Sequence, residues 1–100
     1  MVFYVLLALT DEPRHGWSLV REVQDRMGER LLPGNFYRTL RRMLSDGLIK
    51  EVSPEDETPQ DERRRYFKLT ESGERLAKAE ARRLEALVVE ARDRRLLKAR

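Results

Sequence analysis

Residues 33–49, PGNFYRTLRRMLSDGLI, form the stretch that decides the fold of this chain. Apolar residues recur in it at the spacing of one helix face, namely Phe36, Leu40, Met43 and Leu44. Pro33 suits the first helical turn, and Gly47 is free to adopt the positive φ that ends a helix. Between the apolar positions lie residues that point outward: Tyr37, Arg38, Arg41, Arg42 and Ser45. A helix with an apolar back and an arginine-rich front is what a DNA-reading helix needs.

The basic charge of the chain is concentrated around this helix. The 100 residues carry a net charge of only +3, with 40% hydrophobic and 39% charged residues, which fits one small domain rich in surface. Residues 33–50 hold four basic residues against one acidic residue, whereas residues 1–32 balance four against five. This local basicity favours a nucleic-acid contact at one helix of a neutral body.

Several classes of function are disfavoured by composition. The chain has no cysteine and one histidine, which argues against a disulfide framework, thiolate chemistry and a structural zinc site. The apolar opening MVFYVLLALT lacks the flanks of a signal peptide, and no run reaches the roughly 18–20 apolar residues of a membrane span. No catalytic constellation or phosphate-binding loop is present. We therefore expect a cytoplasmic protein that is not an enzyme, with no cofactor and no membrane partner.

The segments around residues 33–49 predict a winged helix-turn-helix. A first helix is expected over residues 1–9, and a second from about residue 15 or 16 to 27, before Gly28. Residues 48–52 and 65–69 have strand character and bracket a polar loop, so they predict a hairpin, the wing. The predicted fold class is mainly α with a small β-hairpin, continued by one long C-terminal helix.

The C-terminal helix is expected to hold two copies of the chain together. Thr70 is predicted to cap it, and nothing interrupts it before about Arg95, which gives roughly 35 Å at about 1.5 Å per residue. Its heptad-like apolar residues are the predicted dimerisation set: Leu76, Ala77, Ala81, Leu84, Leu87, Val88 and Ala91. The alternative is that this stripe folds back on its own domain. Residues 1–70 are thus expected to bind DNA and residues 71–100 to dimerise.

The chain resembles the PadR-like family of bacterial transcriptional regulators over nearly its full length. The resemblance rests on LLAL at 6–9, PRHGW at 13–17, PG at 33–34, FYR at 36–38, DGLI at 46–49, RRRYF at 63–67 and LTESG at 69–73. It implies a winged-helix domain with a C-terminal dimerisation helix, in the single-helix branch of the family. It also implies binding to double-stranded operator DNA as a homodimer, usually as a repressor.

The candidate DNA contacts lie on two elements. Those on the reading helix are Asn35, Tyr37, Arg38, Thr39, Arg41 and Arg42, and those at the base of the wing are Arg64 and Arg65. The arginines are alternatively a solvated charged face, and Tyr37 a half-buried brace. Acidic residues in the wing oppose phosphate binding, and they favour a second hypothesis, a winged-helix protein-interaction module without DNA binding.

Two aromatic positions near the second helix have competing interpretations. Trp17 is expected to pack in the core between the second and last helices. The alternative is that it lines a cavity at the dimer interface for a small aromatic effector. His15 is expected to have a structural, hydrogen-bonding role.

Overall fold

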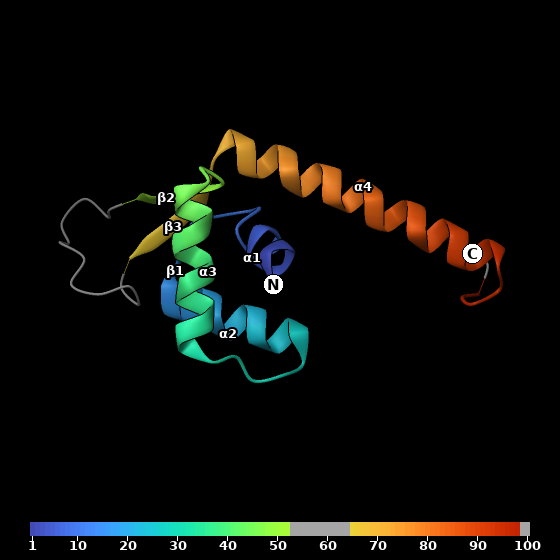
Figure 1. Ribbon diagram of the computed structural model, residues 1–100, viewed down its shortest axis with the longest axis horizontal. Helices are drawn as coiled ribbons and strands as arrows, with labels where there is room; N and C mark the ends of the chain where they lie inside the picture. The colour runs from blue at the N-terminus through green and yellow to red at the C-terminus, as the bar shows by residue number, and fades with distance from the viewer. Residues whose placement is uncertain (53–64, 99–100) are drawn as a thin grey trace.

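The computed structural model describes residues 1–52 and 65–98, which form four helices and three short strands (Figure 1). In chain order these are α1 (Val2–Ala8), β1 (Arg14–His15), α2 (Gly16–Met27), α3 (Pro33–Ser45), β2 (Ile49–Val52), β3 (Tyr66–Leu69) and α4 (Glu71–Asp93). The predicted winged-helix class is confirmed. The predicted helix over 33–45 is confirmed at both ends, and the last helix ends at Asp93, two residues short of expectation.

One core joins α1, α2, α3 and the sheet. Its fully buried side chains come from every one of these elements: Val5, Leu6, Leu19, Val23, Phe36, Leu40, Met43, Ile49 and Phe67. The spacing of four and three residues within α3 brings Phe36, Leu40 and Met43 onto the buried face, as predicted. Burying each large side chain is worth about 1.5–3 kcal/mol, so α3 is held chiefly by its back.

The sheet has three strands rather than the two of the predicted hairpin. Their order is β1-β3-β2, and both pairings are antiparallel. β2 and β3 pair as expected for a wing, with Ile49 opposite Leu69 and Val52 opposite Tyr66. The strand that sequence reasoning missed is β1, where Arg14 pairs with Phe67 and His15 with Tyr66. Two residues are too few to show the alternation of apolar and polar residues that predicts a strand. β1 is a strand only because it pairs with β3.

The end of α3 is a glycine stop of the predicted kind. Gly47 adopts φ 75°, and its amide donates to the carbonyl oxygen of Leu44 at 3.1 Å. The amide of Leu48 donates to the carbonyl oxygen of Met43 at 3.0 Å. These two bonds form a Schellman motif, which turns the chain sharply into β2.

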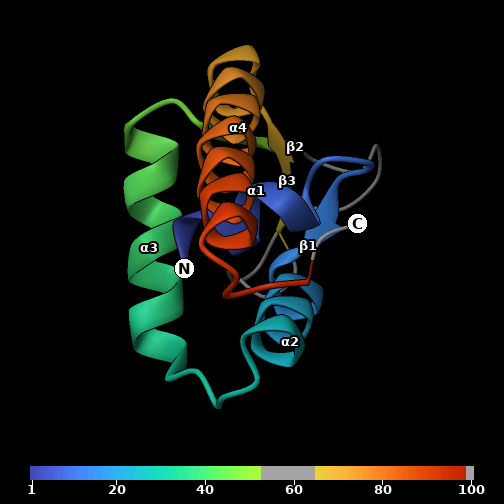
Figure 2. The same cartoon turned by 90° about the vertical axis from the view of Figure 1, so that its right-hand side faces the viewer.

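α4 begins at the sheet and then leaves the body of the protein. Thr70 caps it as predicted, because its side-chain oxygen accepts from the amide of Gly73 at 3.0 Å. The first turns of α4 contact α1, whereas residues 81–90 are all exposed. Figures 1 and 2 show the helix extending past α1, and the molecule measures 52 × 29 × 21 Å.

The predicted packing of Trp17 in the core is wrong. Its side chain is 46% exposed, at the start of α2. The physical reason is helical phase: Trp17 lies two residues before the fully buried Leu19, and two residues turn an α-helix through about 200°. Trp17 therefore points away from the buried side of α2.

Candidate nucleic-acid interface

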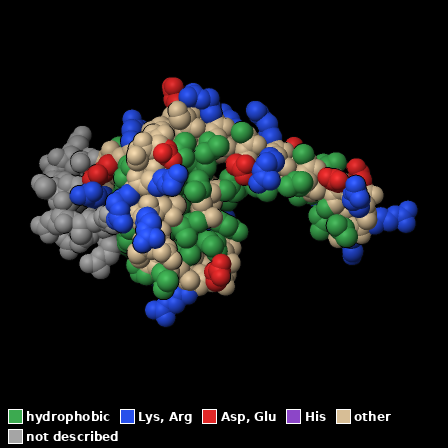
Figure 3. Space-filling view, viewed as in Figure 1, with side chains coloured by type: hydrophobic (Ala, Val, Ile, Leu, Met, Phe, Trp, Pro, Cys, Tyr) green, Lys and Arg blue, Asp and Glu red, His purple; other side chains and the backbone are tan. Residues whose placement is uncertain are grey.

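The outer face of α3 presents the arginines that the sequence places there. Arg38, Arg41 and Arg42 are exposed, while Phe36 and Leu40 on the opposite face are almost completely buried. Figure 3 shows Lys and Arg side chains gathered over α3 on the face it displays. The helix is thus anchored by its back, and its basic front is accessible from solvent.

At the end of the helix, one acidic residue lies beside this face. The Nε of Arg42 lies 3.9 Å from Oδ2 of Asp46, and both side chains are largely exposed. A pair at this distance in water is weak and is screened by salt, so it does not prevent Arg42 from meeting a phosphate.

The polar and aromatic candidates on α3 are more constrained than the arginines. The hydroxyl of Thr39 donates to the backbone carbonyl oxygen of Asn35 at 3.1 Å. Tyr37 is half-buried and meets Phe36 edge to face, with 5.5 Å between ring centroids. Tyr37 therefore has the bracing contact that one interpretation of the sequence gave it. Asn35 is exposed near the start of the helix, where the N-cap residue is Leu32, whose side chain has no capping atom.

At the base of the wing, the structure describes one of the two predicted arginine contacts. Arg65 precedes β3, and its Nε lies 3.6 Å from Oε1 of Glu51 on β2. Its carbonyl oxygen accepts from the amide of Gly16 at 3.0 Å, which ties the wing to the start of α2. Arg64, the other predicted contact of the wing, lies outside the described residues.

An aromatic cluster that sequence reasoning missed joins the wing to α2. The ring centroid of His15 lies 3.6 Å from that of Tyr66 and 6.1 Å from that of Trp17. Arg21 lies over the indole, 6.0 Å from its centroid. His15 therefore has a structural contact, through its ring. The cluster forms because residues 14–15 pair with residues 66–67. A pairing between segments so far apart in the chain leaves no local sequence pattern, so the cluster could not be predicted.

The predicted dimerisation residues divide into two groups along α4. Leu84, Leu87 and Val88 are exposed, and Leu87 reaches 50%. Ala77, by contrast, packs against the core of its own protomer, so for this residue the fold-back alternative holds. The remaining members of the set, Leu76 and Ala81, are exposed, whereas Ala91 is half-buried.

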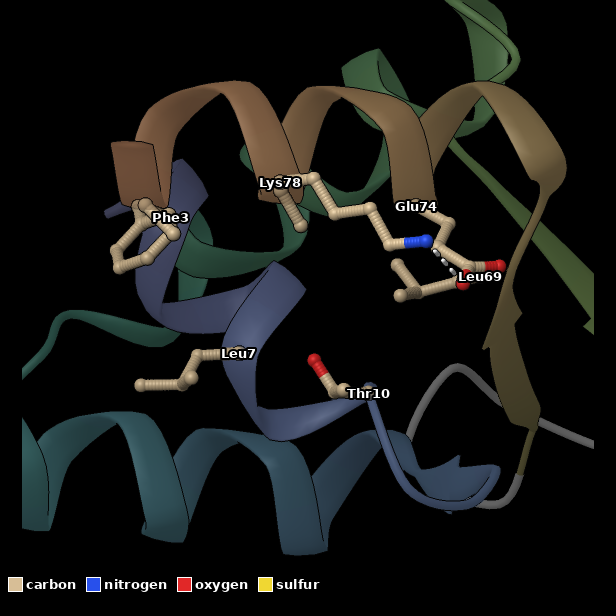
Figure 4. A pocket seen from close by; sticks show the side chains of 8 residues that line it. Phe3, Leu7, Thr10, Leu69, Glu74 and Lys78 are labelled. Carbon is tan, nitrogen blue, oxygen red and sulfur yellow. Dashed lines mark ion pairs between the residues drawn. The ribbon is translucent and has the colours of Figure 1, made fainter. Parts of the chain in front are cut away.

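An apolar groove runs between α1 and the first half of α4. Phe3 and Leu7 line it from α1, and Ala77 and Ala81 line it from α4. Figure 4 shows the Lys78–Glu74 ion pair beside it, with 3.3 Å between Nζ and Oε1. Beyond Ala81, the last residue of α4 that lines the groove, the exposed residues Leu84 and Val88 follow at three- and four-residue spacing on the same helix face. The structure thus has two accessible surfaces of contrasting chemistry, one basic on α3 and one apolar on α4.

Metal and membrane sites find no support in residues 1–52 and 65–98. No group of three or more His, Cys, Asp or Glu side chains there is placed to hold a metal ion. Within the same residues, no helix combines the length and the hydropathy that a bilayer span requires.

Comparisons with known proteins agree with this arrangement. The family model of the transcriptional regulator PadR-like family matches residues 5–79. An uncharacterized 37.1 kDa protein in transposon TN4556 of Streptomyces fradiae is 34% identical over 77 residues. That match covers 77% of this chain and 21% of the relative, so the chain spans about a fifth of the relative's length.

Solved structures share the fold at low sequence identity. A PadR family transcription regulator from Clostridium difficile has a TM-score of 0.71 at 23% identity, covering 96% of this chain and 97% of that one. A transcriptional regulator from Clostridium thermocellum has a TM-score of 0.71 at 18% identity, with 92% and 86% covered. RosR of H. salinarum has a TM-score of 0.66 at 22% identity, with 96% and 93% covered.

Proposed function

Because this chain belongs to the PadR-like family of transcriptional regulators, we propose that it binds operator DNA sequence-specifically as a homodimer and represses transcription. The observation that carries the proposal is the two-sided α3. Its back is buried through Phe36 and Leu40, and its front exposes Arg38, Arg41 and Arg42. The proposal assigns no catalytic step to the protein.

In the proposed complex α3 enters the major groove. An arginine there can donate two hydrogen bonds to one guanine edge or contact phosphates, and each good bidentate pair contributes about 1–3 kcal/mol of discrimination. Arg65 and Arg64 at the base of the wing would contact the adjacent backbone. Thr39 and Asn35 would approach the backbone near the start of α3, and Tyr37 would meet a phosphate or a thymine methyl group from its half-buried position.

The exposed apolar part of α4 supports the homodimer. Leu84, Leu87 and Val88 follow the turns of α4 that line the α1–α4 groove, and all three are exposed large apolar side chains. A second copy of α4 lying on this stripe and on the α1–α4 groove would bury both surfaces. Residues 71–100 would then be the dimerisation segment and residues 1–70 the DNA-binding domain. Two-fold symmetry would set the half-sites about 34 Å apart.

Repression follows from the size of such a complex. A dimer that occupies two successive major grooves covers more than one turn of DNA. If that DNA lies within a promoter, the dimer excludes other proteins from the same site. The expected operator is accordingly a pseudo-palindrome that overlaps a promoter.

The exposed Trp17 supports a place for a small aromatic effector. Its indole lies beside His15 and under Arg21, which is a setting suited to a flat, anionic molecule. The second copy would complete the cavity. Since Trp17 is the single tryptophan, its fluorescence on titration with benzoate tests this directly. If the Trp17 emission of the dimeric protein stays unchanged up to millimolar benzoate, this effector class is refuted.

A mobility-shift experiment tests the DNA-binding proposal. The probe is the DNA upstream of the chain's own gene, with a shuffled duplex of equal length as competitor, at about 50 mM and about 200 mM salt. We expect preferential binding to the upstream DNA that weakens steeply with salt.

The double variant Arg38→Ala with Arg42→Ala should lose this preferential binding. The charge-matched control Arg75→Ala with Arg82→Ala, on α4, should retain it. Equal affinity of both double variants would refute α3 as the reading helix.

A further inference from the structure

The end of α3 and the start of α4 are joined by one side chain. The hydroxyl of Thr70 donates to the carbonyl oxygen of Gly47 at 2.5 Å, and the hydroxyl oxygen of Thr70 accepts from the amide of Gly73 at 3.0 Å. The backbone amide of Thr70 donates to the carbonyl oxygen of Leu48 at 3.1 Å. Thr70 thus bonds to the residues that stop α3 and to the first turn of α4.

Close packing at Gly73 reinforces this junction. Gly73 is buried, and a Cβ built on it would lie 2.0 Å from the carbonyl oxygen of Leu48 and 3.0 Å from its carbonyl carbon. Backbone atoms cannot yield to such an overlap as a flexible side chain can. The first turn of α4 therefore rests directly on the chain that leaves α3.

We infer that Thr70 is a positioning residue that sets the direction of α3 relative to α4. The consequence for DNA rests on the proposed function, in which α4 holds two copies together and α3 reads the operator. In such a dimer, Thr70 joins α4, which makes the dimer contact, to α3, which reads DNA. The geometry at Thr70 would therefore determine the distance between the two reading helices.

The length of α3 makes this junction sensitive. Thirteen residues at about 1.5 Å each make a helix of about 20 Å, anchored at its C-terminal end by Gly47 and Thr70. A tilt of about 10° at that end moves the other end by about 3 Å, which is close to the rise of one base pair. A small change at Thr70 would therefore take the arginines out of register with their bases.

Paired spin labels within one protomer measure the α3–α4 geometry. The chain has no cysteine, so Gly34→Cys on α3 and Arg82→Cys on α4 give two specific sites, both exposed. An excess of unlabelled protein restricts the measured distance to a single protomer. Thr70→Val removes the hydroxyl and keeps the shape, Thr70→Ser keeps the hydroxyl, and Gly73→Ala forces the helices apart.

We expect a narrow distance distribution for the parent and for Thr70→Ser, and a shifted or broadened one for Thr70→Val and Gly73→Ala. Thr10→Val is the matched control, because its hydroxyl donates to the carbonyl oxygen of Leu6 within one helix end. Operator affinity should fall by about tenfold in Thr70→Val, the loss expected from one misaligned base contact. If Thr70 only capped α4, the melting temperature would fall while the distance stayed the same.

The outcomes separate this inference from the proposed function. An unchanged distance in Thr70→Val would overturn the inference, whether or not the parent binds DNA and whatever the distance in Gly73→Ala. Should Thr70→Val fail to fold, the distance in Thr70→Ala, which also lacks the hydroxyl, decides. A shifted distance in a protein that binds no DNA would uphold the junction and refute the proposed function.

Discussion

Arg65 lies against Glu51 across the wing, with 3.6 Å between its Nε and Oε1 of the glutamate. The side chains are 41% and 33% exposed, and Nε of Arg65 is buried without a hydrogen-bond partner among the described residues. The distance is beyond hydrogen-bonding range, so the contact is an ion pair only. In the proposed complex, Glu51 would therefore compete with a DNA phosphate for Arg65.

Removing this carboxylate should strengthen DNA binding. Glu51→Gln leaves Arg65 without its acidic neighbour and removes one negative charge from the wing, so operator affinity at low salt should rise by a few-fold, about 0.5–1 kcal/mol. Fluorescence anisotropy with labelled operator measures this. In the background of Arg65→Ala the gain should shrink. An equal gain in both backgrounds would mean that Glu51 acts through general charge alone.

The salt dependence of binding should report the role of Arg38. If this arginine neutralises a phosphate in each protomer, Arg38→Ala should reduce the slope of log affinity against log salt by about 2 in the dimer. If it reads a base instead, the slope should persist while discrimination between operator and shuffled DNA falls. A variant that changes neither quantity would exclude Arg38 from the interface.

A charge on the exposed stripe of α4 should separate the two copies. Leu84→Glu would bury a carboxylate in the proposed contact, and an unpaired buried charge costs about 3–5 kcal/mol, so the dimer dissociation constant should rise about a hundredfold or more. Sedimentation velocity over a concentration series measures it. Ala79→Glu introduces the same charge on another side of α4 and should leave the dimer intact. The same sedimentation for both variants would locate the contact elsewhere.

The back of α3 should dominate stability. Leu40 is 1% exposed, and truncating a buried leucine costs about 2–5 kcal/mol through lost burial and the cavity left behind, so Leu40→Ala should unfold at much lower urea concentration. Circular dichroism in urea measures the transition. Leu96→Ala makes the same chemical change at a leucine that is 77% exposed and should leave the midpoint within error.

One carboxyl on α4 should titrate below its ordinary range. Arg83 donates two hydrogen bonds to Glu80, at 2.9 and 3.0 Å, and this contact lowers the pKa of Glu80. A lowered pKa in the folded state means that the contact stabilises α4 above the ordinary glutamate pKa. The contribution is lost as the pH falls through the lowered value. Carbon-13 NMR titration measures the shift, and Arg83→Ala should return it toward the ordinary value.

Helices with strong periodicity were predictable from sequence, because one helix face must be buried. The spacing of Phe36, Leu40 and Met43 and the stop at Gly47 defined α3 to the residue. β1 was not predictable, since Arg14 and His15 become a strand only by pairing with residues far along the chain. The same long-range pairing brings His15 onto Tyr66, so the aromatic cluster was missed with it.

The candidate site was predictable in part. The exposure of the α3 arginines follows from their position on the helix opposite the buried residues. The same argument predicts an exposed indole for Trp17, because it lies two residues before the buried Leu19. The pairing of Arg65 with Glu51 depends on the register of β2 against β3 and on side-chain direction, which sequence spacing alone does not determine.

The uncovered apolar residues of α4 have a consequence for the dose of the protein in a cell. If a second copy covers them, as proposed, the DNA-binding species is governed by mass action between protomers. While most of the chain is monomeric, doubling its amount raises the dimer about fourfold, because association is second order. Leu84, Leu87 and Val88 would thus convert a modest change in synthesis or degradation into a sharper change in promoter occupancy.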